Sequence, residues 1–295
     1  MKKIIIYFGI CIFLLAGYSK AFCGTATKNL YKEKRLAVKV NCFEMKYVEI
    51  GPKNGEPIIF VHGYTDSISS WATTAPLLSD KYHIFVIDQR GHGDSEKPMW
   101  GYTIPQFGED VIAFMDALKI KKAVIVGHSM GSFVAHYLSA IHPERVSSMV
   151  LIGSAPTCVR NPGAVGLYKV VSAADFKDPV DPAFIKEWQT CQIPLDPQFA
   201  ARQAEQCAKV PVRVWRAALL GLLTDDHTDF LKNIKTPTLI IWGDQDGFFS
   251  KSDQDALKAA VPGAVLKIYA GTGHNVQWEQ GQKVAGDIRS FLESR

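Results

Sequence analysis

Residues 123–141 read AVIVGHSMGSFVAHYLSAI, and the pattern changes in the middle. The apolar run 123–127 predicts a buried strand, and the spacing of residues 130–141 predicts a helix. Between them, residues 127–131 have the form G-x-S-x-G with Ser129 at the centre. Such a strand-to-helix turn holds the serine in a strained conformation and places its hydroxyl at the helix N-terminus. Free N–H groups and the helix dipole favour developing negative charge there.

Outward from this turn, strand and helix patterns alternate along the chain. The strand runs are apolar throughout, which is typical of a parallel sheet buried on both faces. We therefore predict an α/β fold with a mostly parallel central sheet and helices on both faces. The predicted strands are 43–50, 57–61, 83–88, 123–127, 146–152, 238–242 and 265–269, and the predicted helices are 104–118, 130–141, 251–260 and 276–292.

Residues 156–227 interrupt this alternation. They contain no strand run rich in β-branched residues, and their helical patterns are separated by prolines. We interpret this stretch as a helical cap inserted over the strand ends, with 27–155 and 228–295 as the core. The length of 295 residues allows one large α/β domain with such an insertion. The large apolar residues of the cap are expected mainly to pack against one another, and some of them to face a pocket: Phe184, Trp188, Trp215, Leu219 and Leu222.

A serine hydroxyl is a weak nucleophile until a base takes its proton. The best-placed candidate is His274, which follows the last predicted strand and precedes the closing helix. A carboxylate must then orient this histidine and stabilise its imidazolium form. The end of the strand 238–242 offers two, of which Asp246 is preferred and Asp244 is the alternative.

These motifs carry a family resemblance. From about Cys42 to the C-terminus the chain resembles the α/β-hydrolase fold superfamily, in a serine esterase-like or lipase-like form with a helical cap. The resemblance implies the chain order Ser129, Asp246, His274, with the acid at the second Asp of a G-x-x-D loop. In some members the acid follows the preceding strand, but residues 153–156 here contain no carboxylate. The matching segments are HGY at 62–64, DQRGHGDSEKP at 88–98, GHSMG at 127–131, WGDQDG at 242–247 and GTGH at 271–274.

Acyl transfer places negative charge on a carbonyl oxygen, and two preorganised N–H groups should meet it. The backbone N–H of Met130, next to Ser129, is one candidate. The loop after His62 and Gly63 resembles the family's oxyanion turn and nominates the N–H of Tyr64 as the second. The side chains of Tyr64 and Met130 are expected either to line an acyl pocket or simply to pack.

The expected activity is hydrolysis of a carboxylic ester that has an apolar portion, through an acyl-enzyme. This chemistry requires no metal and no organic cofactor. Lactone hydrolysis, C–C bond cleavage and perhydrolysis use the same kind of site and stay open as alternatives. A ligand-binding protein that retains the three residues without turnover is a further alternative.

The N-terminus has the order of a secretory signal peptide. Lys2 and Lys3 precede a 14-residue apolar stretch, residues 4–17, and small residues follow. We expect residues 1–26 to be removed near Ala21 or Ala26, and the protein to be periplasmic or extracellular. It would then meet the membrane only during export. The alternative is an uncleaved membrane anchor.

Charge and cysteine content exclude some partners and suggest one crosslink. The formal net charge is +4 without a block of basic residues, so there is no electrostatic basis for binding nucleic acid. Cleavage after Ala26 leaves Cys42, Cys158, Cys191 and Cys207, without zinc-site spacing. In an oxidising compartment a Cys191–Cys207 disulfide is the preferred pairing, and buried free thiols are the alternative.

Overall fold

The chain forms an eight-stranded, mostly parallel sheet in the order β1-β2-β4-β3-β5-β6-β7-β8. This computed structural model describes residues 29–295, so the predicted signal peptide, 1–26, lies outside the described residues. From β4 to β8 every neighbouring pair is parallel, whereas β1 and β2 add an antiparallel edge. The strands are β1 (Leu36–Val40), β2 (Phe43–Ile50), β3 (Pro57–Val61), β4 (His83–Ile87), β5 (Ala123–His128), β6 (Val146–Ile152), β7 (Thr238–Gly243) and β8 (Val265–Tyr269).

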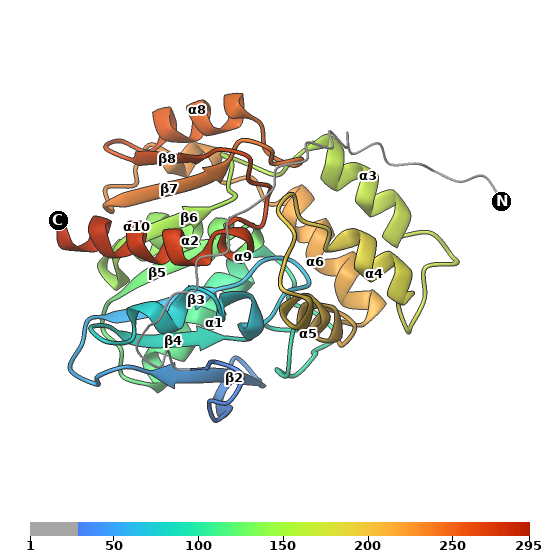
Figure 1. Cartoon of the computed structure of the whole chain (residues 1–295), viewed down its shortest axis with the longest axis horizontal. Coiled ribbons are helices and arrows are strands. Elements are labelled where there is room, and N and C mark those ends of the chain that lie inside the picture. Colours follow the sequence, from blue (N-terminus) through green and yellow to red (C-terminus); the bar gives the residue numbers. More distant parts are fainter. Residues whose placement is uncertain (1–28) are drawn as a thin grey trace.

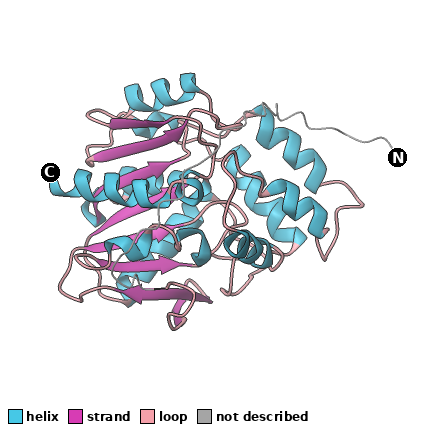
Figure 2. Ribbon diagram, in the orientation of Figure 1, coloured by secondary structure: helices cyan, strands magenta, loops and turns pink. Residues whose placement is uncertain are grey.

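Helices cover both faces of this sheet, as predicted (Figure 2). Successive strand residues point to opposite faces, so Ile59 and Val61 pack with α1 and α2, whereas Ile58 and Phe60 pack with α10. The α/β fold with two covered faces is therefore confirmed. The helices of the core are α1 (Ile104–Ala117), α2 (Met130–Ile141), α7 (Thr228–Leu231), α8 (Lys251–Ala260), α9 (Val276–Glu279) and α10 (Gly281–Glu293). None of the helices in the described residues is long and apolar enough to span a membrane.

The parallel strands end together at one edge. Val61 of β3 pairs with Gly127 of β5, and His128 of β5 pairs with Ile152 of β6. The loops that leave these strands therefore begin side by side. This alignment brings segments that are far apart in sequence to the same place.

Four helices, α3 to α6, lie beyond one end of the sheet (Figure 1). They are α3 (Pro162–Val171), α4 (Pro182–Trp188), α5 (Pro197–Cys207) and α6 (Val212–Thr224), all inserted between β6 and β7. Three of the prolines that separate the helical patterns in the sequence begin helices: Pro162, Pro182 and Pro197. Asn161, Asp181 and Asp196 each cap a helix through a side-chain oxygen, with proline in the first turn.

Two elements differ from the sequence-based predictions. The strand β1 was not predicted, because as an edge strand it leaves alternate residues exposed. The closing helix, predicted as 276–292, is broken into α9 and α10 at Gln280, whose backbone angles of φ −135° and ψ 43° are not helical. The break seats Gly281 against Thr73, where a Cβ atom would come within 2.5 Å of the threonine side chain. Close packing thus overrides the helical pattern.

Candidate active site

Ser129 occupies the turn between β5 and α2 with a left-handed backbone conformation, φ 48° and ψ −118°. A non-glycine residue rarely adopts such angles unless its surroundings enforce them. Here the Ser129 N–H donates to the carbonyl oxygen of Ile152 at 2.9 Å. The Ser129 carbonyl accepts from the backbone N–H of Ser132 at 2.8 Å and from its hydroxyl at 2.6 Å. Both sides of the turn are therefore fixed.

The two glycines of the motif are required by close backbone approach. A Cβ atom on Gly127 would lie 2.2 Å from the carbonyl oxygen of Gly131. A Cβ atom on Gly131 would lie 2.2 Å from the carbonyl oxygen of Val61, at the end of β3. Side chains cannot be accommodated at such distances, which explains the G-x-S-x-G pattern in this turn.

His274 and Asp246 form a close pair on the loops that follow β8 and β7. Nδ1 of His274 lies 2.8 Å from Oδ2 of Asp246. The other oxygen of Asp246 accepts the N–H groups of Phe248 at 2.8 Å and Phe249 at 3.1 Å. The Asp246 side chain is fully buried, and 16% of the His274 side chain is exposed. The carboxylate is thus held by the backbone on one side and orients the imidazole on the other.

The electrostatic balance at His274 favours a proton on the ring. Burial is the largest single effect and lowers the pKa of the imidazole. The charge and hydrogen bond of Asp246, together with the carboxylates of Asp66 and Glu279, outweigh it, so the pKa of His274 is raised above its ordinary value of 6.5. Asp244, the alternative acid, instead accepts the backbone N–H of Gly271 at 2.7 Å. It therefore supports the histidine loop rather than the histidine ring.

Ser129 and His274 come to the same edge of the sheet. Gly153 lies close to both residues. It directly follows Ile152, whose carbonyl oxygen accepts the Ser129 N–H. A Cβ atom on Gly153 would lie 3.1 Å from Cε1 of His274. Among the described residues, no hydrogen bond is recorded for the Ser129 hydroxyl. Catalytic hydrogen bonds are often long in free enzymes and tighten with substrate.

The two N–H groups nominated for the oxyanion belong to Met130, which directly follows Ser129, and to Tyr64 in the loop after β3. Met130 is the first residue of α2, so its N–H has no acceptor within that helix. The N–H of Tyr64 donates to no described residue. Gly131 packs against the loop that contains Tyr64, since a Cβ atom on Gly131 would lie 2.7 Å from the carbonyl oxygen of His62. The oxyanion turn and the start of α2 are thus in direct contact.

The side chains of Met130 and Tyr64 pack in the interior instead of lining an open surface. Met130 is fully buried, and Tyr64 is 6% exposed. The Tyr64 hydroxyl donates to the carbonyl oxygen of Trp215 at 2.7 Å, and its ring packs edge-on against Trp188 and Trp215. Tyr64 therefore ties the core to α4 and α6.

Aromatic side chains continue from these helices to the histidine. Trp188 donates through Nε1 to the Thr65 hydroxyl at 2.9 Å, and its ring lies 5.9 Å from that of Phe248. The Phe248 ring lies 5.1 Å from the imidazole of His274. Trp215, Leu219 and Leu222 of α6 are buried, whereas Leu220 of the same helix is exposed. Trp188 and Phe248 thus give the surroundings of His274 an apolar character.

A second buried acid–histidine pair beside the site was not predicted. Oδ2 of Asp66 lies 3.4 Å from Nδ1 of His128, and Nε2 of His128 lies 3.3 Å from the backbone oxygen of His274. Burial lowers the pKa of His128, which favours its neutral form. The sequence holds no local signal for this contact, because Asp66 lies after β3 whereas His128 is the last residue of β5.

The predicted Cys191–Cys207 disulfide is not formed in the structure. All four cysteines of the described residues are free thiols. Cys207 is buried in the interior, whereas the thiol of Cys191 accepts from the Asn275 side chain at 3.6 Å, beside the histidine loop. Burial raises the pKa of the Cys191 thiol to about 12. Within residues 29–295, no group of three or more metal-ligating side chains is arranged to hold an ion.

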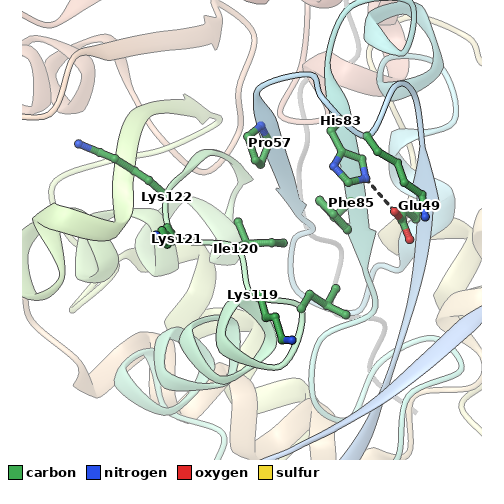
Figure 3. A pocket seen from close by; sticks show the side chains of 10 residues that line it. Glu49, Pro57, His83, Phe85, Lys119, Ile120, Lys121 and Lys122 are labelled. Carbon is green, nitrogen blue, oxygen red and sulfur yellow. Dashed lines mark hydrogen bonds and ion pairs between the residues drawn. The ribbon is translucent and has the colours of Figure 1, made fainter.

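Two surface pockets lie apart from these residues. One is found where β3 and β4 begin, lined by Phe85, Ile120 and four lysines, with His83 paired to Glu49 (Figure 3). The other lies between α4 and α5 and reaches Trp278. Neither is lined by Ser129 or His274, so neither is taken as the reaction site.

Comparison with known proteins identifies the family. A family model described as the alpha/beta hydrolase fold matches residues 56–280, and the chain therefore belongs to the α/β-hydrolase family. A non-heme chloroperoxidase of Streptomyces lividans is 28% identical over 267 residues, covering 84% of this chain and 95% of that protein. A solved structure described as Est816, an N-acyl homoserine lactone degrading enzyme, is 27% identical, with a TM-score of 0.76, covering 87% of this chain and all of that one.

A third relative is longer than this chain. It is the dihydrolipoyllysine-residue acetyltransferase component of the acetoin cleaving system of Pseudomonas putida, 28% identical over 257 residues. The match covers 84% of this chain but only 66% of that protein. The similarity therefore concerns the part of that protein that aligns with this α/β-hydrolase fold.

Proposed function

We propose that this member of the α/β-hydrolase family is a serine hydrolase that cleaves carboxylic esters through an acyl-enzyme. The observation that supports the proposal is a strained serine at the same edge of the sheet as an acid–histidine pair. Ser129 stands at the N-terminus of α2, and His274 is oriented by Asp246 at the same edge of the sheet. Each element has a defined task in acyl transfer.

In the first step, the Ser129 hydroxyl attacks the ester carbonyl carbon while Nε2 of His274 takes its proton. The negative charge that develops on the carbonyl oxygen is met by the N–H groups of Met130 and Tyr64. His274, now an imidazolium stabilised by Asp246, returns the proton to the leaving alcohol. Water then attacks the acyl-enzyme with the same base, releasing the acid and restoring Ser129.

The substrate class follows from the surroundings of the base. The Phe248 ring packs beside His274, and the Trp188 ring packs against Phe248. These apolar surroundings lead us to expect an ester with an apolar portion. A lactone is a cyclic ester and requires the same chemistry. The similarity to a solved lactone-degrading enzyme makes lactones the second substrate class to test.

We also propose that the protein works outside the cytoplasm. The basic residues Lys2 and Lys3 followed by the apolar stretch 4–17 support export. Cell fractionation, with the N-terminal sequence of the mature protein, tests this: export predicts a chain that begins after Ala21 or Ala26. Full-length chain retained in the membrane fraction would instead support an anchor.

Purified protein tests the activity directly. Wild type should hydrolyse p-nitrophenyl esters of graded acyl length and be labelled by a fluorophosphonate. Ser129→Ala should lower kcat by about 10⁶-fold, as loss of a triad serine does elsewhere, and abolish labelling. Tight ligand binding by a wild-type protein that shows neither turnover nor labelling would support a binding protein and overturn the proposal.

A further inference from the structure

One carboxylate joins the cap to the loop of the catalytic histidine. Glu279, the last residue of α9, accepts three backbone N–H groups. Its Oε2 accepts from Gly273 at 3.0 Å and from Ile193 at 3.2 Å, and its Oε1 accepts from Gln192 at 3.1 Å. Gly273 directly precedes His274, whereas Gln192 and Ile193 lie between α4 and α5. Two segments about eighty residues apart in the chain thus share one acceptor group.

The two segments also touch each other directly. A Cβ atom on Gly273 would lie 3.3 Å from Cβ of Gln192 and 2.8 Å from Oε1 of Glu279. On the other side of His274, the Asn275 side chain donates to the thiol of Cys191 at 3.6 Å. Residues on both sides of His274 therefore contact cap residues 191–192. A shift of the cap segment cannot leave the histidine loop unaffected.

The chemistry of the acceptor matters for this contact. A carboxylate has two oxygens with several lone pairs and can accept three hydrogen bonds. A glutamine side chain of the same shape offers one oxygen, and its NH₂ group would face a backbone N–H. Burial raises the pKa of Glu279 above its ordinary value, and the three N–H donors act in the opposite direction. Burying the charged Glu279 carboxylate thus costs free energy, and the three N–H donors offset part of that cost.

Resting on the proposed function, we propose that Glu279 is a positioning residue that couples the seating of the cap to the placement of His274. It touches no reacting atom and acts through Gly273. With the cap segment in place, the three hydrogen bonds hold the loop so that His274 can serve Ser129. When the cap segment leaves, Glu279 loses two of three donors and the loop loses its brace.

Glu279→Gln tests the coupling without changing side-chain size. Because small misplacements of a base are costly, kcat for a short ester should fall by about 10–100-fold. The rate of Ser129 labelling by a small fluorophosphonate should fall by a similar factor, since it needs the same base but no cap contacts. The matched control is Glu109→Gln on α1, which removes a carboxylate bonded to Tyr137 and His142. It should keep wild-type kcat and labelling.

A second readout does not depend on activity. Hydrogen exchange of the wild type should show protected amides at Gln192, Ile193 and Gly273. In Glu279→Gln, protection should fall in both segments together, and in Glu109→Gln in neither. If kcat and labelling in Glu279→Gln equal wild type, or if only one segment loses protection, the coupling is wrong. An inactive, unlabelled wild type would count against the proposed function instead, and the exchange result would stand by itself.

Discussion

The two sides of the site are held in different ways. Ser129 is fixed by main-chain contacts: its N–H donates to Ile152 of β6, its carbonyl accepts from Ser132, and Gly131 admits the backbone of Val61. His274 is fixed by side chains that come from elsewhere, above all Asp246 on the loop after β7. The nucleophile is therefore held by the main chain of its own turn and of two neighbouring strands, whereas the base is held by the side chain of a residue on another loop. Each side can be disturbed separately.

Among changes to the residues that hold the serine and the histidine in place, the largest effect is expected on the histidine side. Asp246→Asn should lower kcat by about 10⁴-fold, as the same change does in the serine-protease triad, because the asparagine stabilises the wrong tautomer. The fold should survive, since the side chain keeps its shape. Steady-state ester kinetics measure kcat, and circular dichroism measures whether the fold is retained. Asp244→Asn is the control and should cost less than about tenfold, a loss far below that of a triad member. Equal losses in the two variants would contradict the assignment.

In the turn that holds Ser129, a glycine substitution is expected to act mainly on stability. Gly131→Ala forces a Cβ atom to within 2.2 Å of the Val61 carbonyl oxygen. The free energy of unfolding should fall by about 1–3 kcal/mol, with loss of activity as the turn shifts. The control is Gly166→Ala in α3, where a Cβ atom would meet no atom within 4 Å. It should instead stabilise by up to about 1 kcal/mol. Urea unfolding of both variants measures the difference in the free energy of unfolding. Unchanged stability in Gly131→Ala would contradict the view that close backbone packing holds Ser129.

The smallest effect is a shift of the pH profile. Catalysis needs neutral His274, whose pKa is raised by Asp246, so the acid limb of kcat/KM should have its midpoint above about 6.5. The contribution of His274 to the free energy of unfolding should change with pH in the opposite direction. A raised folded-state pKa stabilises the fold at low pH, and this contribution is lost as pH rises through that pKa. Activity and urea unfolding measured across this range should show opposite slopes. A midpoint clearly below the free value would exclude His274 as the base.

The sequence was most informative where burial is uniform. Strands β3, β5 and β6 have both faces covered, so they appear as continuous apolar runs and were predicted nearly residue for residue. The edge strand β1 is half-exposed and was not recognised. The cap was predicted as helical, but its prolines were interpreted as interruptions when three of them begin helices after Asx caps.

In the candidate site, too, some residues could be proposed from local sequence patterns and others could not. Ser129 could be assigned from five residues, and Asp246 and His274 from loops that follow predicted strands. The acceptor role of Glu279 toward Gln192 and Ile193 could not, because nothing in α9 indicates which part of the cap lies against it. The same holds for Asp66 and His128. These contacts depend on tertiary packing, which local patterns do not encode.

The cap leaves and rejoins the sheet between two strands that are direct neighbours. The two strands are parallel, and Met149 of β6 pairs with Thr238, the first residue of β7. The chain therefore leaves the carboxyl end of β6 and returns to the amino end of β7, and the sheet fixes both points whatever lies between them. The entropy of closing a loop grows only with the logarithm of its length, by about 0.6 kcal/mol for each doubling. Longer, shorter or wholly different insertions are thus thermodynamically inexpensive at this point. The geometry allows substrate range to diverge in evolution while the sheet beneath keeps its register.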